Sequence, residues 1–202
     1  MGLVFGILFY LSYLIPNRFQ ILQPRLLPMS ALDEAIPLVP WTIFIYISEY
    51  LLFIIAYLIY SNTVSKNRFV WTFIGLSLSS SLVFFLFPTT YPRDLFPIPA
   101  DTHWFVAAAF EGIRKLDNPN NCLPSMHIGA CYATTLTYFS NEESRKKFWI
   151  FFIWAGIIAI STLTTKQHYF VDIIAGWIFA YAMYWIFCKK TEYYKTTSHI
   201  PG

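Results

Sequence analysis

The chain has 202 residues, which is enough for one domain or a small pair of domains. Hydrophobic residues make up 56% of it, aromatic residues 20% and charged residues only 12%. A soluble domain has roughly 25% charged residues, so this composition predicts an integral membrane protein. A net charge of +3 excludes a strongly basic nucleic-acid-binding module, and the hydrophobic content excludes intrinsic disorder.

Apolar runs long enough to cross about 30 Å of hydrocarbon recur along the chain. They predict six transmembrane helices, over residues 2–15, 38–60, 69–87, 124–139, 148–164 and 169–187. The first run is short, but it lacks the basic start and the cleavage site of a signal peptide, so we expect it to be a span. The expected fold class is therefore an all-α membrane protein with a single membrane domain over residues 1–202.

The long segment 88–123 is rich in Pro, Asp and Asn, which predicts a loop rather than a span. Within it, residues 104–116 are suited to a short helix at the membrane interface. Small residues in the last three spans predict close helix packing. They are Gly129, Ala133, Gly156, Ala159, Gly176 and Ala180.

An even number of spans places both termini on one side of the membrane. The side of the termini holds eight cations, which are Lys66, Arg68, Arg145, Lys146, Lys147, Lys189, Lys190 and Lys195. The other side holds six, which are Arg18, Arg25, Arg93, Arg114, Lys115 and Lys166. This excess predicts cytoplasmic termini and an outer loop 88–123. The short chain without N-glycosylation sequons favours a bacterial inner membrane.

The three cysteines, Cys122, Cys131 and Cys188, have neither the number nor the spacing of a disulfide framework or a metal site. We expect unbridged thiols, no metal ion and no cofactor. Glu49 lies in the middle of the second span, where a carboxylate is costly. A functional role for Glu49 and a role as a hydrogen-bonded packing residue are both left open.

Two histidines carry the sequence patterns that indicate chemistry. His127 follows Pro124 and Ser125 at the start of the fourth span, where helix N–H groups attract anions. His168 begins the sixth span, and Asp172 follows four residues later on the same helix face. A carboxylate in that position can hold the imidazole in one tautomer and stabilise its positive form.

Two cations accompany these histidines on the same predicted membrane surface. Arg93 comes after the third span, and Lys166 lies two residues before His168. Each element alone is more typical of an interfacial histidine, a helix-surface pair or a snorkelling cation. Together they favour phosphate chemistry, because cations hold the oxygens, one imidazole attacks phosphorus and the other protonates the leaving oxygen.

These residues fall into three ordered motifs. Arg93 is followed by Pro124-Ser125-Met126-His127, and then by a third motif that begins at Ser161 and includes His168 and Asp172. Over residues 87–176 the chain resembles the type-2 phosphatidic acid phosphatase superfamily, the lipid phosphate phosphatases. The second motif matches Pro-Ser-x-His, and the third matches Ser-Arg-x5-His-x3-Asp with one change.

The resemblance implies a metal-independent enzyme that handles a lipid phosphate in a bilayer. His168 would be the nucleophile that forms a phosphohistidine, Asp172 would orient it, and His127 would be the general acid. Arg93 and Ser125 would bind phosphate oxygens at the non-cytoplasmic ends of the third to sixth spans. The resemblance implies no nucleic-acid partner, and the sequence does not predict an oligomeric state.

Two positions depart from the family pattern. Leu86 stands where the first motif usually has a lysine, and Thr162 replaces the arginine of the third motif. We expect Lys166 to replace one of these phosphate-binding cations. Residues 165–169 resemble a branch related to inositol phosphorylceramide and sphingomyelin synthases, so transfer of a phosphoryl headgroup to a lipid alcohol remains an alternative to hydrolysis. A non-catalytic lipid-binding or transport protein is the alternative from another class.

Overall fold

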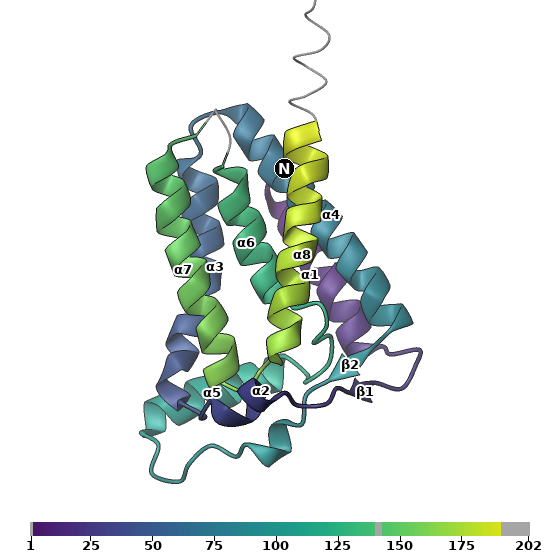
Figure 1. The fold of residues 1–202 in the computed structure, drawn as a ribbon, viewed down its shortest axis with the longest axis vertical. Helices are drawn as coiled ribbons and strands as arrows, with labels where there is room; N and C mark the ends of the chain where they lie inside the picture. The colour runs from purple at the N-terminus through teal and green to yellow at the C-terminus, as the bar shows by residue number, and fades with distance from the viewer. Residues whose placement is uncertain (1, 140–142, 191–202) are drawn as a thin grey trace, which may run out of the picture.

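The computed structural model describes residues 2–139 and 143–190, and only the backbone of residues 2–9. Most of the helices run side by side along the long direction of a bundle (Figure 1). These are α1 (Gly2–Arg18), α3 (Ile43–Ile59), α4 (Thr63–Leu86), α6 (Met126–Thr137), α7 (Arg145–Thr164) and α8 (Phe170–Tyr184). A 3-10 turn, Pro40–Thr42, precedes α3, and a π-helical turn, Trp185–Lys189, follows α8.

All six predicted spans are helical, and the all-α prediction is confirmed. Four helical segments are long and apolar enough to cross a membrane, which are Pro40–Ile59, Thr63–Leu86, Arg145–Thr164 and Phe170–Lys189. α1 and α6 are shorter, with 17 and 12 residues. That these two helices also cross the bilayer stays a prediction. Lys195, one of the cations used to predict the topology, lies outside the described residues.

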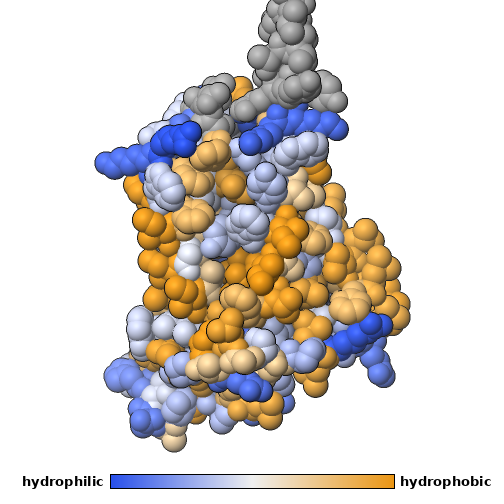
Figure 2. Space-filling view, in the orientation of Figure 1, coloured by the Kyte–Doolittle hydropathy of each residue, from blue (hydrophilic) through white to orange (hydrophobic). Residues whose placement is uncertain are grey.

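The outside of the bundle is apolar. Leu58, Leu78 and Ile160 are 68%, 63% and 63% exposed, although each lies in one of the long helices. Removing such a side chain from water is worth roughly 1.5–3 kcal/mol. Figure 2 shows hydrophobic side chains over the middle of the bundle and hydrophilic ones near its ends. This distribution suits a bundle whose middle is surrounded by lipid.

Aromatic side chains fill much of the interior. Tyr138, the C-cap of α6, stacks on Tyr60 and Phe151, with ring centroids 4.4 and 4.9 Å apart. Its hydroxyl donates to the carbonyl of Ala56 at 2.5 Å. At the end of the bundle where α6 ends and α7 begins, Glu143 pairs with Lys147 at 3.0 Å. This end is opposite to the one at which α6 begins.

Short elements cover the end of the bundle where α6 and α8 begin (Figure 1). β1 (Arg25–Leu26) pairs in parallel with β2 (Thr89–Thr90), with Arg25 opposite Thr89 and Leu26 opposite Thr90. α2 (Ala31–Ala35) and α5 (Trp104–Leu116) lie at the same end. The bounds of α5 confirm the predicted helix 104–116, and its position at a membrane interface stays a prediction.

α6 and α8 approach each other closely at two glycines, Gly129 and Gly176. A Cβ atom on Gly176 would lie 2.6 Å from the carbonyl oxygen of Ser125 and 3.1 Å from the amide nitrogen of Gly129. Such contacts with backbone atoms cannot be relieved by a rotamer change, so Gly176 is needed for this packing. At Gly156, no atom of another described element lies within 4 Å of the corresponding position, so the close contact predicted there is absent from the described part of the chain.

Substitution of Gly176 by alanine is predicted to destabilise the protein. The added methyl group must push α6 and α8 apart, at a cost of about 1–3 kcal/mol in the free energy of unfolding. We expect a lower midpoint of thermal unfolding in detergent for Gly176→Ala. For the matched variant Gly156→Ala we expect an unchanged or higher midpoint, because alanine favours the helix there and meets no neighbouring atom. Equal unfolding midpoints for the two variants would contradict the packing described here.

Candidate active site

The predicted site residues lie at the end of the bundle where α4 and α7 end and α6 and α8 begin (Figure 1). His127 is the second residue of α6, and Ser125 is its N-cap. Asp172 is in the first turn of α8, and His168 precedes that helix by two residues. Arg93 begins a 3-10 turn, Arg93–Leu95, after α4 and β2. The structure therefore gathers the residues of all three motifs at one end.

A tight turn after α7 brings His168 to this position. The amide of Lys166 donates to the carbonyl of Leu163 at 3.1 Å, and the amide of Gln167 donates to that of Thr162 at 3.0 Å. This is the Schellman arrangement, which requires a left-handed residue after the helix cap. Lys166 takes that conformation with φ 53°, although glycine adopts it at lower cost. The backbone is therefore strained just before the proposed nucleophile.

Asp172 fixes the orientation of His168. One carboxylate oxygen, Oδ2, lies 3.2 Å from Nδ1 of His168 and accepts the amide proton of Tyr169 at 2.9 Å. The contact thus runs through the cap of α8 rather than along a helix face, because α8 begins only at Phe170. A carboxylate accepts hydrogen bonds, so Nδ1 carries the proton and the lone pair is on Nε2. This tautomer is the one that a nucleophilic imidazole needs.

The starts of α6 and α8 are joined directly. The amide of Ser125 donates to the carbonyl of Asp172 at 3.2 Å, and the Ser125 hydroxyl accepts from the amide of Ile128 at 3.3 Å. This junction places the rings of His127 and His168 next to each other, with centroids 5.6 Å apart. Two imidazoles at this separation can act on the same phosphorus ester.

His127 has partners that the sequence did not reveal. Its Nε2 lies 2.7 Å from the hydroxyl of Tyr46 and 3.2 Å from Oε1 of Glu49, both on α3. Its Nδ1 is buried and has no hydrogen-bond partner within the part of the chain that the structure describes. In the sequence, the only indication of these partners was Glu49, an ionisable side chain in the middle of an apolar run. The structure shows that Glu49 contacts His127, a predicted catalytic residue.

Arg93 is held by Asp117. Its guanidinium donates to the Asp117 carbonyl at 2.6 Å and to Oδ2 of the same residue at 3.1 Å, while Nε is unpartnered among the described residues. The other carboxylate oxygen accepts from Tyr13 at 2.5 Å and from Asn17 at 3.3 Å, both on α1. Asp117 therefore orients Arg93, the side chain predicted to bind phosphate. The position of Asp117 in a polar loop of the sequence did not indicate this role.

A second guanidinium lies near Arg93. Burial and the charge of Arg93 lower the pKa of Arg114, which donates to the Phe96 carbonyl at 3.0 Å. The two arginines raise the positive potential at this end of the bundle, which favours a phosphate.

Lys166 points towards α2. Its ammonium donates to the carbonyl of Asp33 at 2.5 Å and lies 4.7 Å from the centroid of the Phe96 ring. Burial lowers the pKa of Lys166, and the charge of Asp33 opposes this effect. The Asp33 carboxylate in turn accepts the amide proton of Phe170 at 2.7 Å, so it caps α8. The predicted role of Lys166 in phosphate binding stays a prediction.

The hydroxyls of the third motif turn back into α7. Ser161 donates to the carbonyl of Ile158 at 2.6 Å, and Thr162 donates to that of Ala159 at 2.8 Å. Thr162 occupies the position at which the family pattern has an arginine. Its side chain therefore forms a hydrogen bond within α7 instead of extending a cation into the site.

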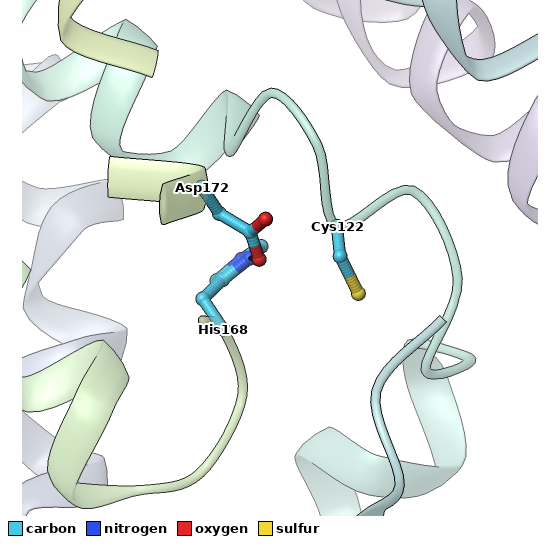
Figure 3. A group of neighbouring side chains, drawn as sticks. All are labelled: Cys122, His168 and Asp172. Carbon is cyan, nitrogen blue, oxygen red and sulfur yellow. Dashed lines mark hydrogen bonds and ion pairs between the residues drawn. The ribbon is translucent and has the colours of Figure 1, made fainter. Parts of the chain in front are cut away.

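Cys122 lies beside the His168–Asp172 pair (Figure 3). Its Sγ, a ring nitrogen of His168 and a carboxylate oxygen of Asp172 lie within 4.8 Å of one another, a spacing that could hold a metal ion. Burial and the charge of Asp172 raise the pKa of the Cys122 thiol, which donates to the Pro119 carbonyl at 3.4 Å. A metal would have to displace that proton. The sequence missed this group because its members come from separate segments, and the expectation of no metal stays a prediction.

A family model described as the PAP2 superfamily matches residues 18–186. This match spans most of the chain and all the motifs above, so the chain belongs to the PAP2 superfamily. Members are usually phosphatases or phosphotransferases of phosphate esters. The resemblance to this superfamily is confirmed, whereas the relation to inositol phosphorylceramide synthases stays a prediction. No curated protein matches the chain significantly.

Removal of the Asp117 charge is predicted to destabilise this end of the bundle. In Asp117→Asn, Arg93 loses its ionic partner and a charge-assisted hydrogen bond, which costs about 2 kcal/mol. Thermal unfolding in detergent should show a lower midpoint, whereas the exposed neighbour variant Asp94→Asn should unfold like wild type. Wild-type stability of Asp117→Asn would mean that this ion pair does not organise the site.

Proposed function

We propose that this protein is a membrane-embedded lipid phosphatase that hydrolyses a phosphate monoester or diphosphate through a phosphohistidine on His168. The observation that carries the proposal is the placement of two imidazoles with centroids 5.6 Å apart, one of them oriented by Asp172. Membership of the PAP2 superfamily supports phosphoryl chemistry at this site. The experiments below test which lipid is the substrate and whether the reaction proceeds through His168.

In the proposed reaction, Nε2 of His168 attacks the terminal phosphorus and forms an N–P bond. The bond from that phosphorus to the leaving oxygen breaks, which is the lipid alcohol oxygen in a monoester and the bridging oxygen in a diphosphate. His127 gives its proton to that leaving oxygen. The carboxylate of Asp172 stabilises the positive charge that develops on the His168 ring. Water then attacks phosphorus with His127 as the base, the N–P bond breaks, and inorganic phosphate is released.

Phosphate oxygens would be bound by groups around the two histidines. Arg93 is a suitable ligand because its Nε is buried and unpartnered among the described residues. Ser125 and the first N–H groups of α6 provide further donors, since helix N-termini bind anions. Lys166 belongs to the proposal as a further phosphate-binding cation, which requires its ammonium to leave the Asp33 carbonyl.

A lipid substrate follows from the surroundings of the site. The residues sit at one end of a bundle whose long helices are apolar enough to cross a membrane. A headgroup phosphate could thus reach the histidines while its acyl or isoprenoid chain stays in lipid. The cation distribution supports a site on the non-cytoplasmic side, and we place the protein in a bacterial inner membrane.

Transfer to a lipid alcohol is the second candidate reaction. It is favoured by residues 165–169, which resemble a branch related to inositol phosphorylceramide and sphingomyelin synthases. In that reaction the second step is the same, except that a lipid hydroxyl takes the place of water. A non-catalytic binding or transport protein is the remaining alternative, and it predicts phosphate-lipid binding without any covalent intermediate.

Phosphate release by the purified protein in detergent tests the proposal. The panel contains phosphatidic acid, phosphatidylglycerol phosphate and undecaprenyl diphosphate, each with chelator and with or without an added lipid alcohol. We expect chelator-resistant release that His168→Ala lowers by about a thousand-fold or more. Release that depends on a metal, or that survives in His168→Ala, would contradict the mechanism. A phosphorylated lipid product formed only with the added alcohol would identify the transferase instead.

Lys166 is tested by Lys166→Ala. If its ammonium binds substrate phosphate, KM should rise about tenfold, which corresponds to about 1.4 kcal/mol of lost binding. The exposed Lys115, which pairs with Glu111 at 3.8 Å, provides the control variant Lys115→Ala with an unchanged KM. An unchanged KM in Lys166→Ala would remove Lys166 from the phosphate-binding set.

A further inference from the structure

A buried carboxylate lies directly behind the proposed general acid. Glu49 is on α3, 3% of its side chain is exposed, and its Oε1 lies 3.2 Å from Nε2 of His127. α3 is part of the apolar segment Pro40–Ile59. A carboxylate in such a segment is expensive and usually has a function. Its second oxygen, Oε2, has no partner in the described part of the chain, so packing alone does not explain this residue.

Tyr46 holds the same ring nitrogen from one turn earlier on α3. Its hydroxyl lies 2.7 Å from Nε2 of His127, and its ring centroid lies 4.9 Å from the imidazole. Tyr46 is itself buried in a cluster with Ile43 and with Phe110 of α5. Tyr13 of α1 adds an edge contact to the His127 ring, with centroids 6.1 Å apart. Side chains of α1 and α3 thus hold His127 in one orientation.

This arrangement decides which nitrogen of His127 is available. Nε2 is directed towards α3 by Tyr46 and Glu49, so Nδ1 is the nitrogen that remains for a substrate. Nδ1 is buried and unpartnered among the described residues, as expected of a group whose partner arrives with a ligand. At His168 the opposite holds, because Nδ1 is bound by Asp172 and Nε2 remains available.

We propose that Glu49, assisted by Tyr46, is a positioning residue that makes His127 an effective general acid. This inference rests on the proposed function. The Glu49 carboxylate accepts from the Nε2–H of His127 and stabilises the imidazolium, which then gives its Nδ1 proton to the leaving lipid oxygen. The ring becomes neutral, keeps its proton on Nε2, and recovers the other proton on Nδ1 from the attacking water. Glu49 exchanges no proton at any step.

Each imidazole thereby has its own carboxylate from a different helix. Asp172, at the start of α8, serves the nucleophile, and Glu49, within α3, serves the general acid. The ring of His168 lies beside that of His127, with centroids 5.6 Å apart, and the positive charge that develops on His168 during its attack opposes a positive charge on His127. A carboxylate on the α3 side offsets this repulsion, which gives Glu49 a specific reason to be retained inside an apolar helix.

The dependence of the rate on the leaving group tests the inference. A lipid alcohol is a poor leaving group and needs a proton, whereas 4-nitrophenolate leaves without one. For Glu49→Gln we expect kcat on phosphatidic acid to fall about 100-fold, the size of a general-acid contribution, with KM unchanged. On 4-nitrophenyl phosphate the same variant should lose less than about threefold, and this activity also shows that it is folded. Tyr46→Phe should show the same pattern with about a tenfold loss.

Glu143→Gln is the matched control, because Glu143 is a buried carboxylate that pairs with Lys147 at the opposite end of the bundle. It should leave kcat on both substrates unchanged. Equal losses on both substrates in Glu49→Gln, or no loss on either, would overturn the inference while wild-type activity still supports the proposed function. If wild type neither turns over these substrates nor forms a phosphohistidine, the proposed function fails and this inference fails with it.

Discussion

The close approach of α6 and α8 is the constraint on which the candidate site depends. Gly129 and Gly176 let the two backbones meet, and the amide of Ser125 then bonds to the carbonyl of Asp172 at 3.2 Å. His127 follows Ser125 at the start of α6, and His168 contacts Asp172. The contact between Ser125 and Asp172 therefore sets the distance between the two imidazole rings. A wider helix crossing would separate the two imidazoles, and neither could then assist the other at one phosphorus atom.

Around this contact, carboxylates at one end of an apolar bundle each hold a specific partner. Asp172 orients His168, Asp117 holds Arg93, Glu49 contacts His127, and Asp33 caps the start of α8. In a medium of low dielectric constant, such groups are costly unless they are paired, and paired groups become rigid. The polar end of the bundle is thus organised before a substrate arrives, and this preorganisation is what electrostatic catalysis requires.

The sequence predicted those features that depend on neighbouring residues. Apolar runs located the helices, the short helix 104–116 was placed correctly, and a four-residue spacing paired His168 with Asp172. It did not predict the contacts of His127 with Glu49 or of Lys166 with Asp33, whose partners are 78 and 133 residues apart in the chain. Such contacts depend on how helices pack and leave no local pattern. The sequence also did not predict the left-handed backbone conformation of Lys166, because a residue in that conformation after a helix is usually glycine.

The central claim is that His168 is the nucleophile and that its Nε2 forms a covalent bond to phosphorus. The most direct measurement is to mix the protein with a phosphate-labelled lipid, quench with alkali, and locate the label on the chain by mass spectrometry. The account predicts a phosphoryl group on His168 of the wild-type protein that is absent from His168→Ala. Turnover of the lipid with no label on His168, or with label on another residue, would contradict it.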